Sequence, residues 1–251
     1  MKKLITLSLA LAFVLPLFAQ DSTRTSTTTV KSKKRDWSKI NLSNRPNDHF
    51  MLQIGYNGWA QMPDTINTKG IPRSFNMYFM FDFPFKSDPR FSVGIGAGLA
   101  TDNMYLNKMT VDIAGKSNST LVFKNVGDTN YFKKYKIMTT YLEAPVELRF
   151  AANPLNTNKS WKGAIGAKIG TLLAASAKGK NLMSKSGGTL SSYIDKEKSK
   201  RFFNGTRLSV TGRISKGVFG IYGSYQVNQF IKDGLGPDVR PFQIGISISG
   251  L

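Results

Sequence analysis

The residues that could carry out catalysis or bind a metal are few. His49 is the only histidine in the chain, and there is no cysteine. A hydrolase or acyltransferase brings a nucleophile, a base and an orienting acid together, whereas His49 stands alone before a short apolar alternating segment. Without thiolates, only scattered carboxylates are left as metal ligands. We therefore expect no enzyme, no metal site and no cofactor.

A glycine-rich stretch could be mistaken for a nucleotide-binding motif. Gly94-Ile95-Gly96-Ala97-Gly98 contains closely spaced glycines, but a dinucleotide fingerprint joins a strand to a following helix. Here the glycines alternate with apolar residues and no helical pattern follows. We expect these glycines to allow close packing inside a sheet.

Charged residues recur on one face of several segments whose other face is apolar. They comprise three acids and four bases: Asp82, Glu143, Glu147, Arg149, Lys168, Arg207 and Arg213. Such residues are costly against lipid, and buried charges are tolerated when they pair with one another. We interpret them as a structural charge network, which requires elements that enclose this face.

Those elements are predicted to be strands, because apolar residues recur with period two through eight segments. The segments cover residues 50–57, 75–83, 91–99, 141–150, 161–174, 207–214, 219–228 and 242–249. Long and short connections alternate between them, which is typical of an outer-membrane barrel with both ends in the periplasm. The sequence predicts an all-β fold, an eight-stranded antiparallel up-and-down transmembrane β-barrel over residues 49–251. An eight-stranded barrel is narrow enough for side chains to fill, so we expect a plugged lumen without an aqueous pore.

Aromatic residues near the strand ends favour a bilayer around this barrel. Amphipathic rings settle at the two membrane interfaces, whereas a soluble lipocalin-like barrel turns its apolar face inward. One predicted girdle comprises Phe50, Phe83, Phe85, Phe91, Phe150, Trp161 and Phe219, and the other Tyr56, Trp59, Phe75, Tyr225, Phe230 and Phe242. A soluble periplasmic lipocalin-like ligand-binding barrel stays open as an alternative.

The N-terminal residues indicate export. Met1-Lys2-Lys3 followed by an apolar run up to Ala19 is typical of a secretory signal peptide over residues 1–19. Residues 20–48 are rich in Ser, Thr and Lys without an apolar period, and they predict a disordered basic arm in the periplasm. No later stretch is apolar over the ~20 residues that a spanning helix needs, so a membrane-bound mature chain must be a closed barrel.

The charge balance indicates anionic neighbours. The formal net charge is +20, and for an exported protein the partners are outer-membrane lipids, lipopolysaccharide or glycans, with no nucleic acid. One predicted outer loop is basic, and its possible polyanion-binding residues are Lys185, Lys196, Lys198, Lys200 and Arg201. A lipid- or polyanion-binding or adhesion barrel that acts through such extracellular loops is therefore a second functional alternative.

One strand carries a motif of a known family. The segment Thr140–Phe150, which reads TYLEAPVELRF, resembles a strand of the PorT-like outer-membrane β-barrel family of Bacteroidota. The closing segment 240–248 looks like that family's terminal strand. The resemblance implies a non-enzymatic structural or accessory barrel in the cell envelope, with type IX secretion as one setting and envelope or secretion-system proteins as partners. The oligomeric state stays open.

Overall fold

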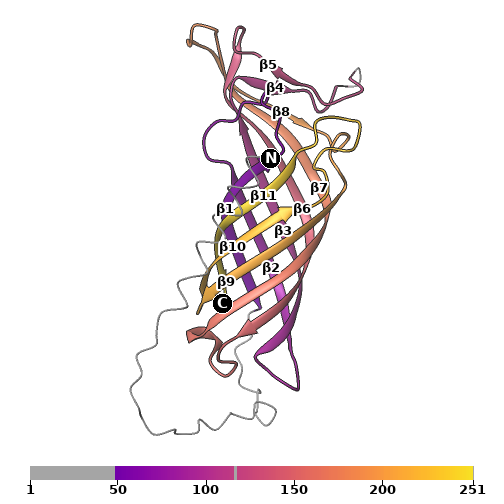
Figure 1. The fold of residues 1–251 in the computed structure, drawn as a ribbon. Helices are drawn as coiled ribbons and strands as arrows, with labels where there is room; N and C mark the ends of the chain where they lie inside the picture. Colours follow the sequence, from indigo (N-terminus) through magenta and orange to yellow (C-terminus); the bar gives the residue numbers. More distant parts are fainter. Residues whose placement is uncertain (1–48, 116–117, 251) are drawn as a thin grey trace, which may run out of the picture. The chain divides into compact units, whose positions relative to one another are not determined.

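Eight long strands pair edge to edge into a closed ring. The computed structural model describes residues 49–115 and 118–250, which belong to one compact unit. The strands of the ring are β1 (Phe50–Ala60), β2 (Arg73–Pro84), β3 (Phe91–Leu106), β6 (Tyr131–Ala151), β7 (Trp161–Met183), β9 (Thr206–Lys216), β10 (Phe219–Gln226) and β11 (Arg240–Ser249). Each pairs antiparallel with the next, and β1 pairs with β11 (Figure 1). The predicted eight-stranded up-and-down barrel is confirmed.

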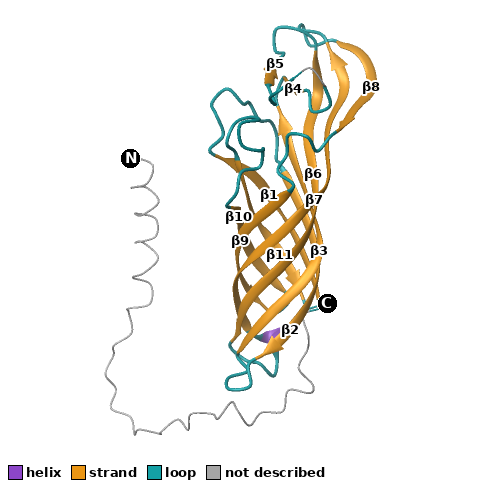
Figure 2. Ribbon diagram, turned by 90° about the vertical axis from the view of Figure 1, so that its right-hand side faces the viewer, coloured by secondary structure: helices purple, strands orange, loops and turns teal. Residues whose placement is uncertain are grey.

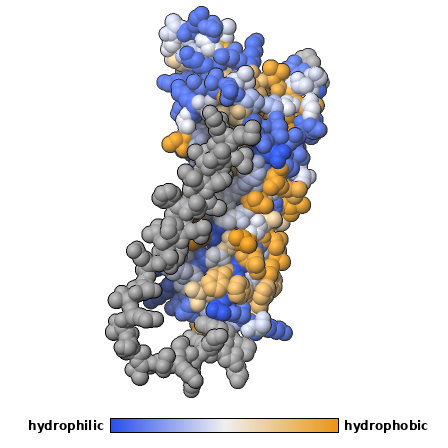
Figure 3. All heavy atoms as spheres, in the orientation of Figure 1, coloured by the Kyte–Doolittle hydropathy of each residue, from blue (hydrophilic) through white to orange (hydrophobic). Residues whose placement is uncertain are grey.

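Alternation along each strand separates an outer face from a lumen face. On β11, Ile246 is 59% exposed while the neighbouring Ser247 is fully buried. The large outward residues of all eight strands form a band on the barrel wall, here called the apolar band; Figure 3 shows part of it on one face. It includes Phe75, Met77, Phe79, Phe81, Ile95, Leu99, Leu142, Val146, Leu148, Ile165, Ile169, Leu173, Leu208, Val210, Ile214, Ile221, Ile244 and Ile246. A soluble lipocalin-like barrel would bury such a face, so that alternative is not favoured.

The two ends of the barrel differ in how the strands are connected. At the end called the turn end, the connections are residues 85–90, residues 152–160 with the 3-10 helix η3 (Thr157–Lys159), and the two residues 217–218. The first of these turns is held by Arg90, whose Nη2 lies 2.6 Å from Asp88 Oδ2. The four other connections meet at the opposite end, called the loop end.

The long connections contain more regular structure than expected. β3 continues to Leu106 and β6 begins at Tyr131, and between them β4 (Met109–Val111) pairs with β5 (Phe123–Asn125). β7 continues to Met183 and pairs with β8 (Thr189–Lys198). The upper parts of β6 and β7 together with β8 form a sheet beyond the barrel, here called the outer sheet (Figure 2). The alternation persists there, but lysines replace apolar residues on the outward face and hide the pattern.

The connections close over the loop end with a hydrophobic core, here called the apolar cap. It includes Trp59, Ile66, Met104, Leu106, Met109, Val111, Ile113, Leu121, Tyr135, Ile137, Phe202, Phe203, Phe230, Ile231 and Val239. Trp59 and Phe230 were expected in the outer aromatic girdle, and that prediction is wrong. Trp59 continues the lumen face of β1 after Gln53 and Asn57, and Phe230 follows the end of β10 and contacts the Trp59 ring.

Some predicted segments lie outside the described residues. These are the signal peptide, residues 1–19, and the basic arm, residues 20–48. Within the described part of the chain, no helix is long and apolar enough to cross a membrane.

Candidate functional site: lumen and outer sheet

The lumen contains two clusters of charged side chains, the first of which centres on Arg207 of β9. Its Nη2 donates to Asp102 Oδ2 at 2.6 Å and its Nη1 to Glu143 Oε1 at 3.2 Å. Lys168 Nζ lies 3.7 Å from Glu143 Oε2, and the Tyr78 hydroxyl donates to that same oxygen at 2.6 Å. All five side chains are buried, so the carboxylates depend on these donors instead of water.

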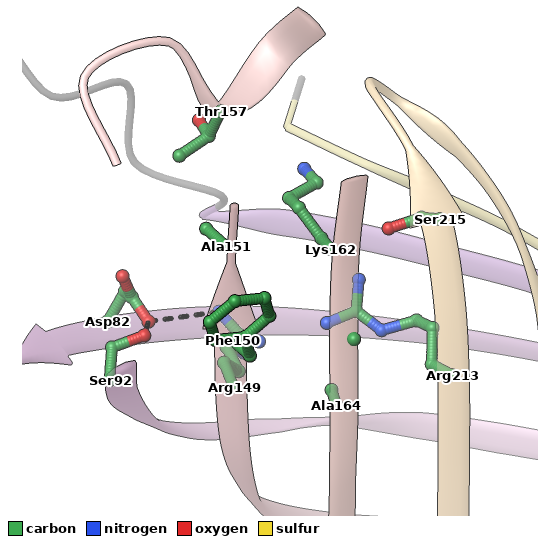
Figure 4. A pocket seen from close by; sticks show the side chains of 11 residues that line it. Asp82, Ser92, Arg149, Phe150, Ala151, Thr157, Lys162, Ala164, Arg213 and Ser215 are labelled. Carbon is green, nitrogen blue, oxygen red and sulfur yellow. Dashed lines mark hydrogen bonds and ion pairs between the residues drawn. The ribbon is translucent and has the colours of Figure 1, made fainter. Parts of the chain in front are cut away.

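The second cluster lies nearer the turn end and centres on Glu147 of β6. Its Oε2 accepts from Arg213 Nη2 and from Arg149 Nε, each at 2.9 Å. Arg149 Nη1 lies 3.5 Å from Asp82 Oδ1 on the other side. Figure 4 shows Arg149 and Arg213 on strands that flank β7, with the small Ala164 of β7 between them. The short side chain leaves the space that the two arginines occupy.

The structure therefore brings all seven predicted lumen residues to the inner face, each beside an opposite charge. Sequence reasoning missed Asp102, which lies beyond the end of the predicted segment 91–99. It continues the lumen face of β3 between Ala100 and Met104, so the alternation could have identified it. With Asp102 included, the buried lumen charges within the described barrel are four acids and four bases, and the half-buried Lys162 lies on the same face at the turn end.

Neutral polar side chains extend the first cluster to two further strands, β11 and β1. Gln243 of β11 donates from Nε2 to Asp102 Oδ1 at 2.7 Å, and Asn76 of β2 donates to Gln243 Oε1 at 2.8 Å. Asn76 Nδ2 also donates to Gln53 Oε1 of β1 at 3.2 Å. Hydrogen bonds thus cross the lumen and link strands that are distant around the ring, which rigidifies the interior.

Small residues make room for these large groups. A Cβ at Gly94 would collide with the Arg149 guanidinium, and a Cβ at Gly98 with Tyr78. The glycine-rich stretch therefore packs against lumen side chains. A cavity lined by Asp82, Arg149 and Arg213 measures ≈ 20 Å³ (Figure 4), and another beside Asn57 and Asp102 measures ≈ 10 Å³. Each has room for about one water molecule.

His49 is engaged at the turn end by groups that offer no catalytic chemistry. Its ring stacks on Phe79, with centroids 5.6 Å apart, and Nδ1 lies 3.1 Å from the Met80 carbonyl oxygen. Among the described residues, no group of three or more His, Asp or Glu side chains is placed to hold a metal ion.

The five residues of the predicted polyanion loop do not converge on one site. Lys185 Nζ lies 3.5 Å from Asp128 Oδ1, Lys200 Nζ contacts the Leu172 carbonyl at 3.5 Å, and Arg201 Nη1 donates to the Gly115 carbonyl at 3.1 Å. Only Lys196 and Lys198 share a surface, the outward face of β8.

That surface continues onto residues that sequence reasoning missed. Lys136 of β6, Lys178 of β7 and Lys196 of β8 are direct neighbours in register. Lys136 lies beyond the apolar band, and its Nζ donates to Asn103 Oδ1 at 2.6 Å. Partial burial, and then the charges of Lys178 and Lys196, lower the pKa of Lys136. The outer sheet therefore carries a concentrated positive charge on one side.

Comparison with known protein families identifies the family of this barrel. The family described as outer membrane protein beta-barrel domain matches residues 18–228. The chain belongs to this family. As an outer membrane protein beta-barrel domain, it has a membrane environment that accounts for an apolar band on the outside and charges on the inside.

Solved structures include two of Ail, the attachment invasion locus protein of Yersinia pestis, that are similar to this chain. The structure in complex with the heparin analogue sucrose octasulfate is 14% identical with a TM-score of 0.35, and the match covers 81% of this chain and 97% of that chain. The second Ail structure is 13% identical with a TM-score of 0.33, covering 82% and 98%. No curated protein sequence matches this chain.

Proposed function

We propose that this outer-membrane barrel is a non-enzymatic structural or accessory protein of the cell envelope with a side-chain-plugged lumen. The observation that carries the proposal is the pairing of the lumen charges beneath the apolar cap. A porin keeps a water-filled, polar channel, whereas here buried arginines and carboxylates occupy the interior. An enzyme of the barrel rim needs a positioned base, and His49 is held by a carbonyl at the turn end.

The proposed orientation places the loop end outside the cell, and the turn end, where β1 begins and β11 ends, in the periplasm. Outer-membrane barrels have short periplasmic turns and longer extracellular connections. The three turn-end connections are short, and the loop-end connections build the outer sheet and the apolar cap.

The outer sheet supports an accessory role because it ends in an open strand. β8 pairs with β7 on one side only, and Leu190, Tyr193 and Ile194 on it are exposed. An unpaired strand edge can accept a strand from a partner. We propose an envelope or secretion-system protein as that partner, and the PorT-like motif of β6 supports a type IX secretion setting in Bacteroidota.

A second candidate function is polyanion or lipid binding on the loop-end surface. The observation that favours it is the group of lysines on the outward face of the outer sheet, to which Lys196 and Lys198 belong.

The first test is heat-modifiability of the protein in an outer-membrane fraction. A shift in gel mobility on boiling, together with no steady conductance in planar bilayers, is expected for a closed, plugged barrel. A photo-crosslinker at Tyr193 should capture an envelope protein, while one at Ile246 in the apolar band serves as the control. Stable conductance would refute the plugged lumen, and equal capture at both positions would refute docking on β8.

A further inference from the structure

Seven basic side chains share the outward surface at the loop end of the barrel. We call this set the basic belt, and it comprises Arg73, Lys134, Lys136, Lys178, Lys180, Lys196 and Lys198. Register places them in three successive rows. The first row contains Arg73 and Lys198, which are joined through Asn103, Met138 and Ser176. The second row contains Lys136, Lys178 and Lys196, and the third contains Lys134 and Lys180.

The positive charge of the basic belt is not compensated from within the protein. Across the described residues, none of its seven members takes part in an ion pair. The acids of β8 alternate with its lysines and point to the other side, where Glu197 accepts a hydrogen bond from the Ile113 amide at 3.2 Å. There, burial raises the pKa of Tyr135 to about 12, and the Glu197 and Asp195 charges add to the rise. The outer sheet thus has the lysines of the basic belt on one face and the acids of β8 on the other.

The position of the basic belt matches the polar edge of a bilayer. On β2, Arg73 is followed on the same face by Phe75, where the apolar band begins. On β6, Lys136 precedes Met138, Thr140 and then Leu142 of the band. A hollow of ≈ 440 Å³ adjoins the belt and is lined by Lys69, Arg73, Ile71, Tyr105, Lys133 and Lys134. Cations therefore stand directly beyond a surface that fits acyl chains.

We propose that the basic belt and this hollow bind the phosphate groups of a bisphosphorylated glycolipid whose acyl chains lie on the apolar band. The inference rests on the proposed orientation, because the loop end must face the leaflet that contains such a lipid. Two steps between same-face residues along a strand span about 13 Å, which suits two phosphates on a sugar headgroup better than a single phosphodiester. Charge-assisted hydrogen bonds from lysine and arginine to phosphate are among the strong ones.

Binding of phosphate groups would also relieve the electrostatic repulsion between neighbouring lysines of the basic belt. Lys136, Lys178 and Lys196 are adjacent on three strands. Partial burial lowers the pKa of Lys136, and the charges of Lys178 and Lys196 lower it further. A dianion placed between them replaces mutual repulsion with attraction, whereas an uncharged headgroup does not. Tyr105, whose ring lies 5.9 Å from Lys136 Nζ, offers the sugar a flat surface beside the cations.

The test measures binding of bisphosphorylated lipid A to the folded, detergent-solubilised full-length protein by native mass spectrometry. The triple variant Lys136→Gln, Lys178→Gln and Lys196→Gln is compared with the control Lys86→Gln, Lys124→Gln and Lys232→Gln, which has the same net charge. Each cation near an anionic surface contributes about fivefold to binding, so the belt variant should bind roughly 100-fold more weakly. The control should bind like the wild type.

Two further arms separate the possible outcomes. Dephosphorylated lipid A should bind weakly to all three proteins, and inorganic pyrophosphate should compete poorly because it lacks acyl chains. Equal binding by the belt and control variants, or full competition by pyrophosphate, would overturn the proposal. Heat-modifiability is measured on the same samples, so loss of the barrel itself is distinguished from loss of the lipid site.

Discussion

Arg207 offers the sharpest test of a dry, plugged lumen. Its guanidinium contacts Asp102 at 2.6 Å and Glu143 at 3.2 Å, and its side chain is 5% exposed. Replacing it in Arg207→Met keeps the apolar stem but leaves two carboxylates with Lys168 as the remaining nearby cation. Each close pair is worth about 4 kcal/mol at an effective dielectric constant of about 20. After desolvation is included, removing one member of a buried pair costs about 3 to 5 kcal/mol.

A double-mutant cycle isolates the pair from the rest of the network. Asp102→Asn alone should also destabilise the barrel, because Arg207 then keeps only Glu143. The double variant, Arg207→Met with Asp102→Asn, restores charge balance. Its free energy of unfolding should fall by about 2 kcal/mol less than the sum of the decreases in the two single variants. Arg240→Met is the matched control, since Arg240 pairs with Asp238 in an exposed position.

The free energies come from denaturant unfolding of the barrel in lipid vesicles, followed by tryptophan fluorescence and by gel mobility without boiling. A coupling between Arg207 and Asp102 within the range of exposed pairs, about 0 to 1 kcal/mol, would refute the reasoning. Such a value would mean that water screens the two groups and that the lumen is hydrated along its length.

Three further predictions concern the glycines, the apolar band and the apolar cap. Gly94→Leu, which must displace Arg149, should abolish the heat-modifiable form, while Gly212→Leu, which faces open space, should keep it; equal behaviour would contradict the packing argument. Ile246→Arg should cost about 2 to 4 kcal/mol near the bilayer midplane, measured by the same unfolding assay, whereas a neutral effect would indicate an outer surface in contact with water. Phe203→Ala removes a fully buried ring and should weaken the apolar cap by about 3 to 5 kcal/mol, seen as faster proteolysis of the outer sheet with an unchanged barrel; no change would show that the cap does not hold the sheet.

The eight strands could be predicted because outward-facing and inward-facing residues alternate along every strand of a membrane barrel. Large apolar residues alternate with small and polar ones, as with Ile246 and Ser247. This pattern is local and survives without any knowledge of strand partners. For the same reason the sequence indicated which side of each strand carried Glu143, Glu147 and Arg149.

The alternating pattern did not predict the strands where their outward residues lie beyond the apolar band. Beyond the apolar band, lysines occupy the outer face of β6 and β7, and the segments resemble polar loops although their inner face is still apolar. Lys136 and Lys178 were missed for this reason, and Asp102 was missed because its outward neighbours on β3, Thr101 and Asn103, are polar as well. Trp59 was misplaced because its aromatic type suggested an interface, while its position in the alternation points inward.

By itself, the sequence determined the barrel, the number of its strands and the identity of most lumen charges, because period two depends only on neighbours along the chain. The tertiary structure alone decided which charges meet and which cations share a surface. Arg207 and Asp102 are 105 residues apart in the chain, and Lys136 stands beside Lys178 only because β6 and β7 pair in one register. Register is set by packing around the whole closed ring, so neither contact can be read from a single segment.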